Sequence, residues 1–86
     1  MKHLKTETDM RDMIHKGNLY DALSRGMKFL KDYGPNTTIQ HLVASIHFAQ
    51  QDYVNAWFFI HRNPDSELKK NVFRKIQWLY PEPYRN

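Results

Sequence analysis

Residues 52–60 constrain the fold of this chain more than any other stretch, because they carry bulky apolar groups around most of a helix. The run reads Asp-Tyr-Val-Asn-Ala-Trp-Phe-Phe-Ile and contains no basic residue. A helix with a single buried stripe would leave Phe58 or Phe59 facing water. We therefore expect neighbouring helices to cover this segment on two sides.

The rest of the chain also has the apolar periodicity of helices. Apolar residues recur three and four positions apart, and no stretch alternates with the period of two that a half-buried strand requires. The spacing predicts five helices, at about residues 7–16, 19–33, 37–49, 53–61 and 66–80. Their short connections favour antiparallel neighbours. We expect one all-α domain over residues 1–86, with helical hairpins at 6–33 and 37–62, a capping helix at 66–80 and a short tail at 81–86.

Short polar residues and glycines mark the expected helix ends. Thr6 is the expected N-cap of the first helix, Thr37 begins a capping-box pattern before the third, and Asp52 is placed to cap the fourth. Gly17 and Gly34 follow the expected ends of the first two helices, where a left-handed residue commonly closes a helix. These positions predict where each helix begins and ends.

The second helix is expected to bury a glycine. Its apolar stripe consists of Leu19, Ala22, Leu23, Gly26, Met27 and Leu30. A glycine within a helix costs about 1 kcal/mol relative to alanine. We therefore expect Gly26 to mark a close approach between helices, and we expect Met10, Met13 and Met27 to fill the core.

The composition narrows the class of protein. The 86 residues include no cysteine, which excludes a disulfide framework and cysteine-based zinc or thiol chemistry. Near residue 1 there is no apolar run of the kind that begins a signal peptide, and no apolar window is long enough for a membrane span. We therefore expect a cytoplasmic protein. Its net charge of +4 is compatible with nucleic-acid contact without demanding it.

Two segments of the chain match at an offset of 34 residues. The sequence GNLYDAL at residues 17–23 aligns with QDYVNAW at residues 51–57. Each segment consists of a polar turn followed by the start of a helix with an alanine in its first turns. An internal repeat of this length predicts two consecutive helical hairpins.

The repeat resembles the tetratricopeptide repeat, whose second helix typically follows a Gly-x-x-x-x-Ala turn and whose unit closes near a proline. Gly17 to Ala22 and the Gly34-Pro35 pair match that pattern, whereas Gln51 replaces the turn glycine in the second unit. The resemblance implies a right-handed array of hairpins in which the last helix is the capping helix that such arrays need.

The resemblance also implies a function. The first helix of each hairpin in such arrays lines a concave surface that holds a peptide or a helix of a partner. The groove positions carried over to this chain are Glu7, Arg11, Ile14, His41, Ser45, Phe48 and Lys75. Phe48 lies off the apolar stripe of its helix, so a partner helix, a second copy of this chain or the last helix is expected to cover it. By analogy of fold, we expect an adaptor or chaperone for another protein.

The last helix offers an alternative function, a small nucleic-acid-binding protein. Its candidate contacts are Arg62, Lys69, Lys70, Arg74 and Lys75, which are interleaved with Phe73 and Trp78. The more ordinary interpretation of such a run is a solvated outer face of a terminal helix.

The histidines do not predict a metal site. They are His3, His15, His41, His47 and His61, and no two of them are four residues apart on a helix, the spacing at which zinc ligands converge. The chain also has no nucleophile motif and no glycine-rich phosphate loop. We therefore expect neither a cofactor nor an enzyme.

Overall fold

The computed structural model describes residues 2–80, so the predicted tail at residues 81–86 lies outside the described residues. Five α-helices make up this part of the chain, which confirms the all-α prediction, and residues 2–80 contain no strand. The helices are α1 (Lys2–His15), α2 (Leu19–Tyr33), α3 (Thr37–Ala49), α4 (Tyr53–Ile60) and α5 (Glu67–Leu79). None of these described helices is long and apolar enough to cross a membrane.

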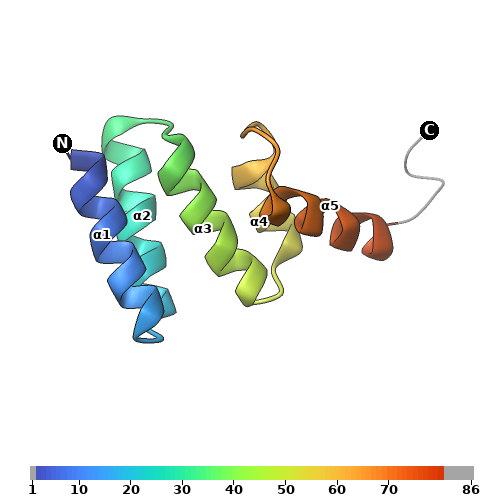
Figure 1. Cartoon of the computed structure of the whole chain (residues 1–86), viewed down its shortest axis with the longest axis horizontal. Coiled ribbons are helices and arrows are strands. Elements are labelled where there is room, and N and C mark those ends of the chain that lie inside the picture. The colour runs from blue at the N-terminus through green and yellow to red at the C-terminus, as the bar shows by residue number, and fades with distance from the viewer. Residues whose placement is uncertain (1, 81–86) are drawn as a thin grey trace.

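The helices follow one another along an elongated body with principal extents of 43, 25 and 20 Å. α1, α2 and α3 stand side by side, and α4 and α5 continue from α3 toward the other end of the long axis (Figure 1). Close packing joins each helix to the next one in the chain, and it also joins α1 to α3. Helices that are consecutive in sequence are therefore neighbours in space.

α1 begins earlier than the sequence predicted. The helix starts at Lys2, so Thr6 lies buried in its second turn and does not cap it. Thr8 Oγ1 donates a hydrogen bond to the Leu4 carbonyl oxygen at 2.9 Å, a bond from one helical turn to the next. The residues before Thr6 include neither proline nor glycine, so nothing in them stops the helix. The predicted Thr6 cap is therefore wrong.

Side-chain caps begin α3, α4 and α5. Asn36 caps α3 by accepting a hydrogen bond from the Ile39 N–H at 3.0 Å, so the predicted Thr37 cap is wrong. Asn36 has an extended backbone, whereas Thr37 already belongs to the helix, which is why the asparagine side chain reaches the free N–H group. Asp52 and Ser66 cap α4 and α5 by accepting from the N–H three residues onward, at 3.3 and 3.1 Å. The predicted Asp52 cap is confirmed.

The turns after α1 and α3 have the same backbone hydrogen bonds at the offset of 34 residues. Gly17 has a φ of 82° and Gln51 a φ of 63°, both in the left-handed region that closes a helix. The N–H groups of Gly17 and Asn18 donate to the carbonyls of Ile14 and Met13 at 3.0 and 2.8 Å, and the residues 34 positions later form the same two bonds at the same distances. The internal match in the sequence therefore corresponds to a matching pair of turns.

A first core cluster lies between α1, α2 and α3. Its buried residues are Met10, Ala22, Phe29, Ile39, Leu42, Val43 and Ile46. A Cβ atom on Gly26 would lie 2.6 Å from Met10 Cε and 2.8 Å from Val43 Cγ2. Such distances leave no room for a side chain, so the predicted close approach of helices at Gly26 is confirmed.

α2 faces this core with Ala22 and Gly26 of its predicted stripe and with Phe29, which the prediction did not include. Ala22, Gly26 and Phe29 are buried, whereas Met27 is 41% exposed, so the prediction that Met27 fills the core is wrong. The Phe29 ring also contacts the Tyr33 ring, with centroids 5.0 Å apart. The aromatic residues make this side the larger apolar surface, which explains the rotation of the helix.

A second and smaller core cluster joins α3, α4 and α5. Its buried residues are Ala44, Ala56, Ile60 and Val72. Phe59 packs against both clusters, and the Trp57 ring lies 5.5 Å from that of Phe73 on α5. The expected cover on two sides is therefore present for Phe59. It is absent for Phe58, which is 66% exposed.

A polar link connects the start of α3 with α5. Asn63 is buried, and its side-chain Nδ2 donates to the Thr37 carbonyl oxygen at 3.1 Å. Lys69 Nζ donates in turn to the Asn63 carbonyl oxygen at 2.7 Å. A buried amide costs little when its hydrogen bonds are made. This link holds the segment between α4 and α5 against α3.

Candidate partner-binding groove

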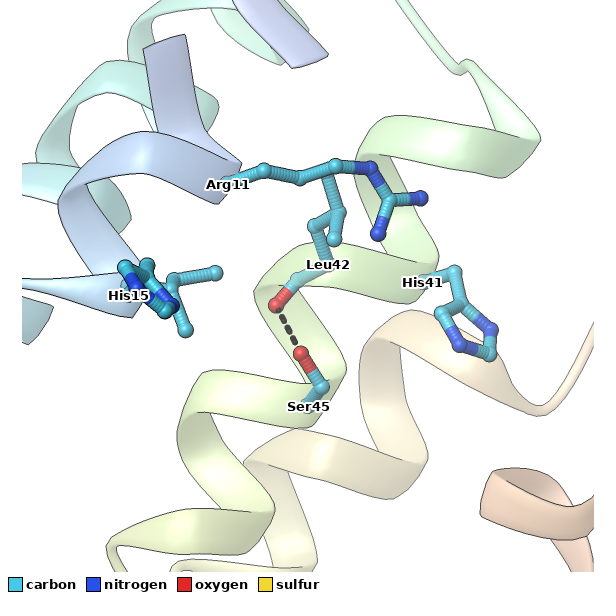
Figure 2. Close-up of a pocket in the computed structure, with 6 residues that line it drawn as sticks. Arg11, His15, His41, Leu42 and Ser45 are labelled. Carbon is cyan, nitrogen blue, oxygen red and sulfur yellow. Dashed lines mark hydrogen bonds between the residues drawn. The ribbon is translucent and has the colours of Figure 1, made fainter. Parts of the chain in front are cut away.

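A pocket of about 370 Å³ opens between α1 and α3. It is lined by Arg11, Ile14, His15, His41, Leu42 and Ser45. Figure 2 shows that the Arg11 side chain reaches from α1 toward α3, where His41 and Ser45 lie on successive turns. The volume falls at the lower end of the range for ligand pockets, which suits one or two side chains of a partner.

Helical spacing brings the lining residues of each helix to one side. On α1, Ile14 and His15 follow Arg11 by three and four residues, and on α3 Ser45 follows Leu42 and His41 by three and four residues. The contact between α1 and α3 then places the two sets opposite each other. The pocket is therefore a consequence of the way the first and third helices pack.

The pocket combines an apolar floor with polar groups at its rim. Leu42 is buried and Ile14 is partly buried, so these two side chains form the floor. The Ser45 hydroxyl donates to the Leu42 carbonyl oxygen at 2.8 Å (Figure 2), which leaves its oxygen lone pairs free to accept a hydrogen bond. Such a surface presents both apolar area and hydrogen-bonding groups to a partner.

The charges of the rim are partly balanced within α1. Arg11 Nε donates to Glu7 Oε2 at 2.9 Å, an exposed pair one turn apart. The pKa of His41 is lowered below its ordinary value of 6.5, first by burial and then by the positive charge of Arg11. The lowered pKa favours the neutral form of His41, and Arg11 supplies the fixed positive charge of the rim.

Two further predicted groove residues are Phe48, which lies further along α3, and Lys75, which lies on α5. Phe48 follows Ser45 by three residues, and its ring meets the Tyr53 ring edge-on with centroids 5.4 Å apart. Lys75 Nζ from α5 lies 5.7 Å from the centroid of the same Tyr53 ring, a cation–π distance. Phe48 is thus partly covered by α4, and Lys75 reaches the end of the α3 face.

The seven predicted groove residues therefore fall into two connected places. Arg11, Ile14, His41 and Ser45 line the pocket and Glu7 bonds to Arg11, whereas Phe48 and Lys75 meet around Tyr53. The sequence did not predict His15, Leu42 or Tyr53 as part of this face. His15 could have been predicted, because it follows Arg11 by four residues and so lies on the same side of α1. Leu42 could not, because it belongs equally to the core stripe of α3.

A second pocket of about 330 Å³, which the sequence did not predict, lies where α2 ends, α3 begins and α4 ends. It is lined by Leu30, Pro35, Gln40, Phe58, Phe59, His61 and Arg62. Exposed Phe58 stands at this pocket with its ring edge-on to that of Phe59, at 5.1 Å. Phe58, the most exposed apolar side chain of α4, therefore lies at this pocket.

The five basic residues of the alternative function do not share one surface. Lys69 is largely buried and holds the Asn63 carbonyl oxygen, while Arg62 lines the second pocket. Lys75 lies over Tyr53 on one flank of α5. Lys70 and Arg74 are exposed one turn apart. The structure thus places Lys70 and Arg74 on one exposed side of α5 and Lys75 on another side of the same helix, whereas Lys69 and Arg62 are engaged in other contacts.

The described residues contain no group of three or more histidine, cysteine, aspartate or glutamate side chains that could hold a metal ion. Comparisons of the chain with protein-family models, with curated proteins and with solved structures give no match.

Proposed function

We propose that this chain is a protein-interaction module, an adaptor or chaperone that binds a helix or peptide segment of another protein along α3. The observation that carries the proposal is the pocket between α1 and α3, because it brings together residues from two helices around an apolar floor with a polar rim. Sites of this composition bind an apolar side chain and orient it by a few polar contacts. We also propose a cytoplasmic location.

The proposed architecture is a tetratricopeptide-like array of two hairpins capped by α5. Two observations support it. The turns after α1 and α3 repeat the same hydrogen bonds at an offset of 34 residues. The close contact of α1 with α3, in addition to the contacts between consecutive helices, is the packing that would place the first helix of each hairpin on one side. In this architecture α1, α3 and α5 line the groove.

The groove would extend along one face of α3. His41, Ser45 and Phe48 occur at spacings of four and three residues, so they form a continuous stripe of about two turns. An amphipathic partner helix presents its own apolar side chains at the same spacing. The pocket would take one such anchor, and the Phe48–Tyr53 ring pair would contact the next. The partner is a segment of another protein or of a second copy of this chain.

The experiment compares two substitutions of serine by arginine. Ser45→Arg places a long charged side chain in the pocket, whereas Ser24→Arg places the same side chain on the exposed surface of α2. Each variant and the wild type are used as bait in a crosslinked pull-down from the source cells, and captured proteins are quantified. Gel filtration of each purified variant reports self-association.

We expect a partner, or a dimer of the chain itself, that is captured by the wild type and by Ser24→Arg. Capture by Ser45→Arg should fall at least tenfold while its circular dichroism remains that of a folded helical protein. Equal capture by all three baits would overturn the proposed groove. A strictly monomeric wild type that retains no protein would overturn the proposed function.

A further inference from the structure

The outer face of α5 carries an exposed ridge, which we define as Lys70, Arg74 and Trp78. These residues are four positions apart, so they line one side of the helix. Trp78 is 81% exposed, although a tryptophan side chain is among the most apolar surfaces that a protein can leave in water. The opposite side of α5 is occupied, because Val72 is buried in the second core cluster. The ridge is therefore an exposed side of α5, the helix that lies at one end of the molecule (Figure 1).

The two cations of the ridge are not neutralised by the described residues. Neither Lys70 nor Arg74 forms an ion pair within residues 2–80. Arg74 Nη1 donates to Asn71 Oδ1 at 3.0 Å, a neutral partner that steadies the guanidinium without cancelling its charge. Glu67 is the single acidic residue of α5, and it lies in the first turn, away from Trp78. The ridge therefore combines free positive charge with an exposed aromatic plane.

We propose that the α5 ridge binds single-stranded nucleic acid, with Lys70 and Arg74 at successive phosphates and an unpaired base stacked on the Trp78 indole. Proteins that bind single strands without sequence preference combine cations for the backbone with aromatic side chains for the bases. The bases of a duplex are already stacked on one another, so an exposed indole finds a free base only in an unpaired strand. The net charge of +4 attracts a polyanion from a distance.

Charge and burial favour this ligand over a lipid surface. A helix that binds a bilayer inserts a continuous apolar face. In α5 that face is packed against α4 through Val72 and its neighbours. Among the described residues of this helix and its C-cap, Phe73 is 44% exposed but stands against the Trp57 ring, and the remaining exposed apolar side chains, Trp78, Leu79 and Tyr80, lie at the helix end and form no continuous apolar face. An acidic peptide would satisfy the two cations, but it gives no reason for an exposed indole in line with them.

The test measures binding of a fluorescent oligo-dT by anisotropy over a series of salt concentrations. For two phosphate contacts on a single strand, the logarithm of the association constant should fall against the logarithm of salt with a slope of about −1.4. Lys70→Ala and Arg74→Ala should each make this slope shallower by about 0.7. Trp78→Ala should weaken binding about tenfold at every salt concentration and leave the slope unchanged.

Matched controls lie on α2. Lys31→Ala and Tyr20→Ala remove an exposed cation and a 77% exposed aromatic ring from another surface, and both should leave binding unchanged. The ridge and control substitutions all change exposed side chains, so circular dichroism should show intact helices.

Absence of binding at low salt, or equal losses in the ridge and control variants, would overturn the proposal. Binding of duplex DNA as tight as that of oligo-dT would contradict recognition of a single strand. Poly-glutamate or anionic phosphatidylserine vesicles that bind more tightly than oligo-dT, with the same loss on Trp78→Ala, would assign the ridge to an acidic protein or a membrane and overturn it too.

Discussion

The two ends of this molecule are held together in different ways. Between α1, α2 and α3, seven buried residues form the first core cluster, and all of them except Ala22 have larger apolar side chains. The helices approach so closely at Gly26 that no side chain fits there. Between α3, α4 and α5, the second cluster has four buried residues, two of which are alanines. Apolar burial is the main source of stability. The α1–α3 end should therefore be the more stable of the two.

The proposed binding surfaces follow this division. The pocket between α1 and α3 belongs to the firmly packed end, so it is present before a partner arrives. The α5 ridge lies at the other end, where helix packing depends on half-buried rings such as Trp57 against Phe73. Preformed sites bind with less loss of conformational entropy than sites that must order on binding. The difference predicts a rigid site at one end and a more mobile one at the other.

The largest expected effect comes from truncating one buried residue in each cluster. Ile46→Ala should cost about 2–5 kcal/mol, because it removes three carbons from the first cluster and leaves a cavity. Val72→Ala should cost roughly 2 kcal/mol, because it removes two carbons from the second. Urea unfolding followed by circular dichroism measures both values. A cost for Val72→Ala that equals or exceeds the cost for Ile46→Ala would contradict the ranking of the two ends.

The close approach at Gly26 allows a sharper test of the first cluster. Gly26→Ala places a Cβ atom against Val43 Cγ2, a stiff branched side chain, and overpacking of this kind costs about 1–3 kcal/mol. Alanine returns about 1 kcal/mol of helix propensity, so the net loss should be about 1 kcal/mol. Ser24→Ala, on the exposed side of α2, is the matched control and should change stability by less than about 0.5 kcal/mol. A stabilised Gly26→Ala protein would show that the helices are not tightly packed there.

Substitutions in the two equivalent turns should change the stability of the protein in opposite directions. Gly17→Ala puts a Cβ atom into the left-handed region and should destabilise the protein by about 1 kcal/mol, although the space around it is open. Gln51→Gly relieves the same conformation in the other turn and should stabilise the protein by up to about 1 kcal/mol. Thermal unfolding of the two variants measures the difference. Changes of the same sign would mean that the two turns do not share the conformation.

The smallest expected effect is a pH dependence at the pocket. Burial and Arg11 lower the pKa of His41 in the folded chain, so the unfolded chain binds a proton more readily. Stability should therefore rise with pH through the interval between the folded pKa and 6.5, and it should be lost as pH falls through that interval. NMR titration should place the pKa of His41 below 6.5, and Arg11→Gln should raise it only in part, because burial is the larger cause. A pKa at or above 6.5 would contradict the placement of this side chain.

The sequence predicted the helices well because each has its own periodicity and its own end signals. The bounds of α2 and the Asp52 cap of α4 were predicted correctly from such local patterns. The start of α1 was predicted wrongly. Threonine is a common N-cap residue, but the residues before Thr6 are equally able to form a helix. Local sequence signals indicate the positions where a helix could begin, and packing determines which of these positions is used.

The placement of side chains across helices was harder to predict. Met27 and Phe29 are equally compatible with the periodicity of α2, and only packing against α1 and α3 determines which of them is buried. In the same way, Lys69 could not be distinguished from Lys70 by sequence, although it reaches the Asn63 carbonyl oxygen from another element. Arg11, Ile14, His41 and Ser45 were predicted to lie together because the 34-residue match paired their two helices in the sequence, and these four residues line one pocket.

The α1–α3 end is firmly packed and presents a preformed pocket, while α4 and α5 are held by a smaller core. Amide hydrogen exchange of the free protein, resolved by residue, tests this difference most directly. Interior amides of α2 and α3 should exchange only through global unfolding, and those of α5 should exchange through a smaller local opening. Val72→Ala should speed amide exchange in α5. The α2 amides should still exchange only through global unfolding, at the rate set by the global stability of the variant. Equal protection of α2 and α5 in the wild type would contradict this difference in packing.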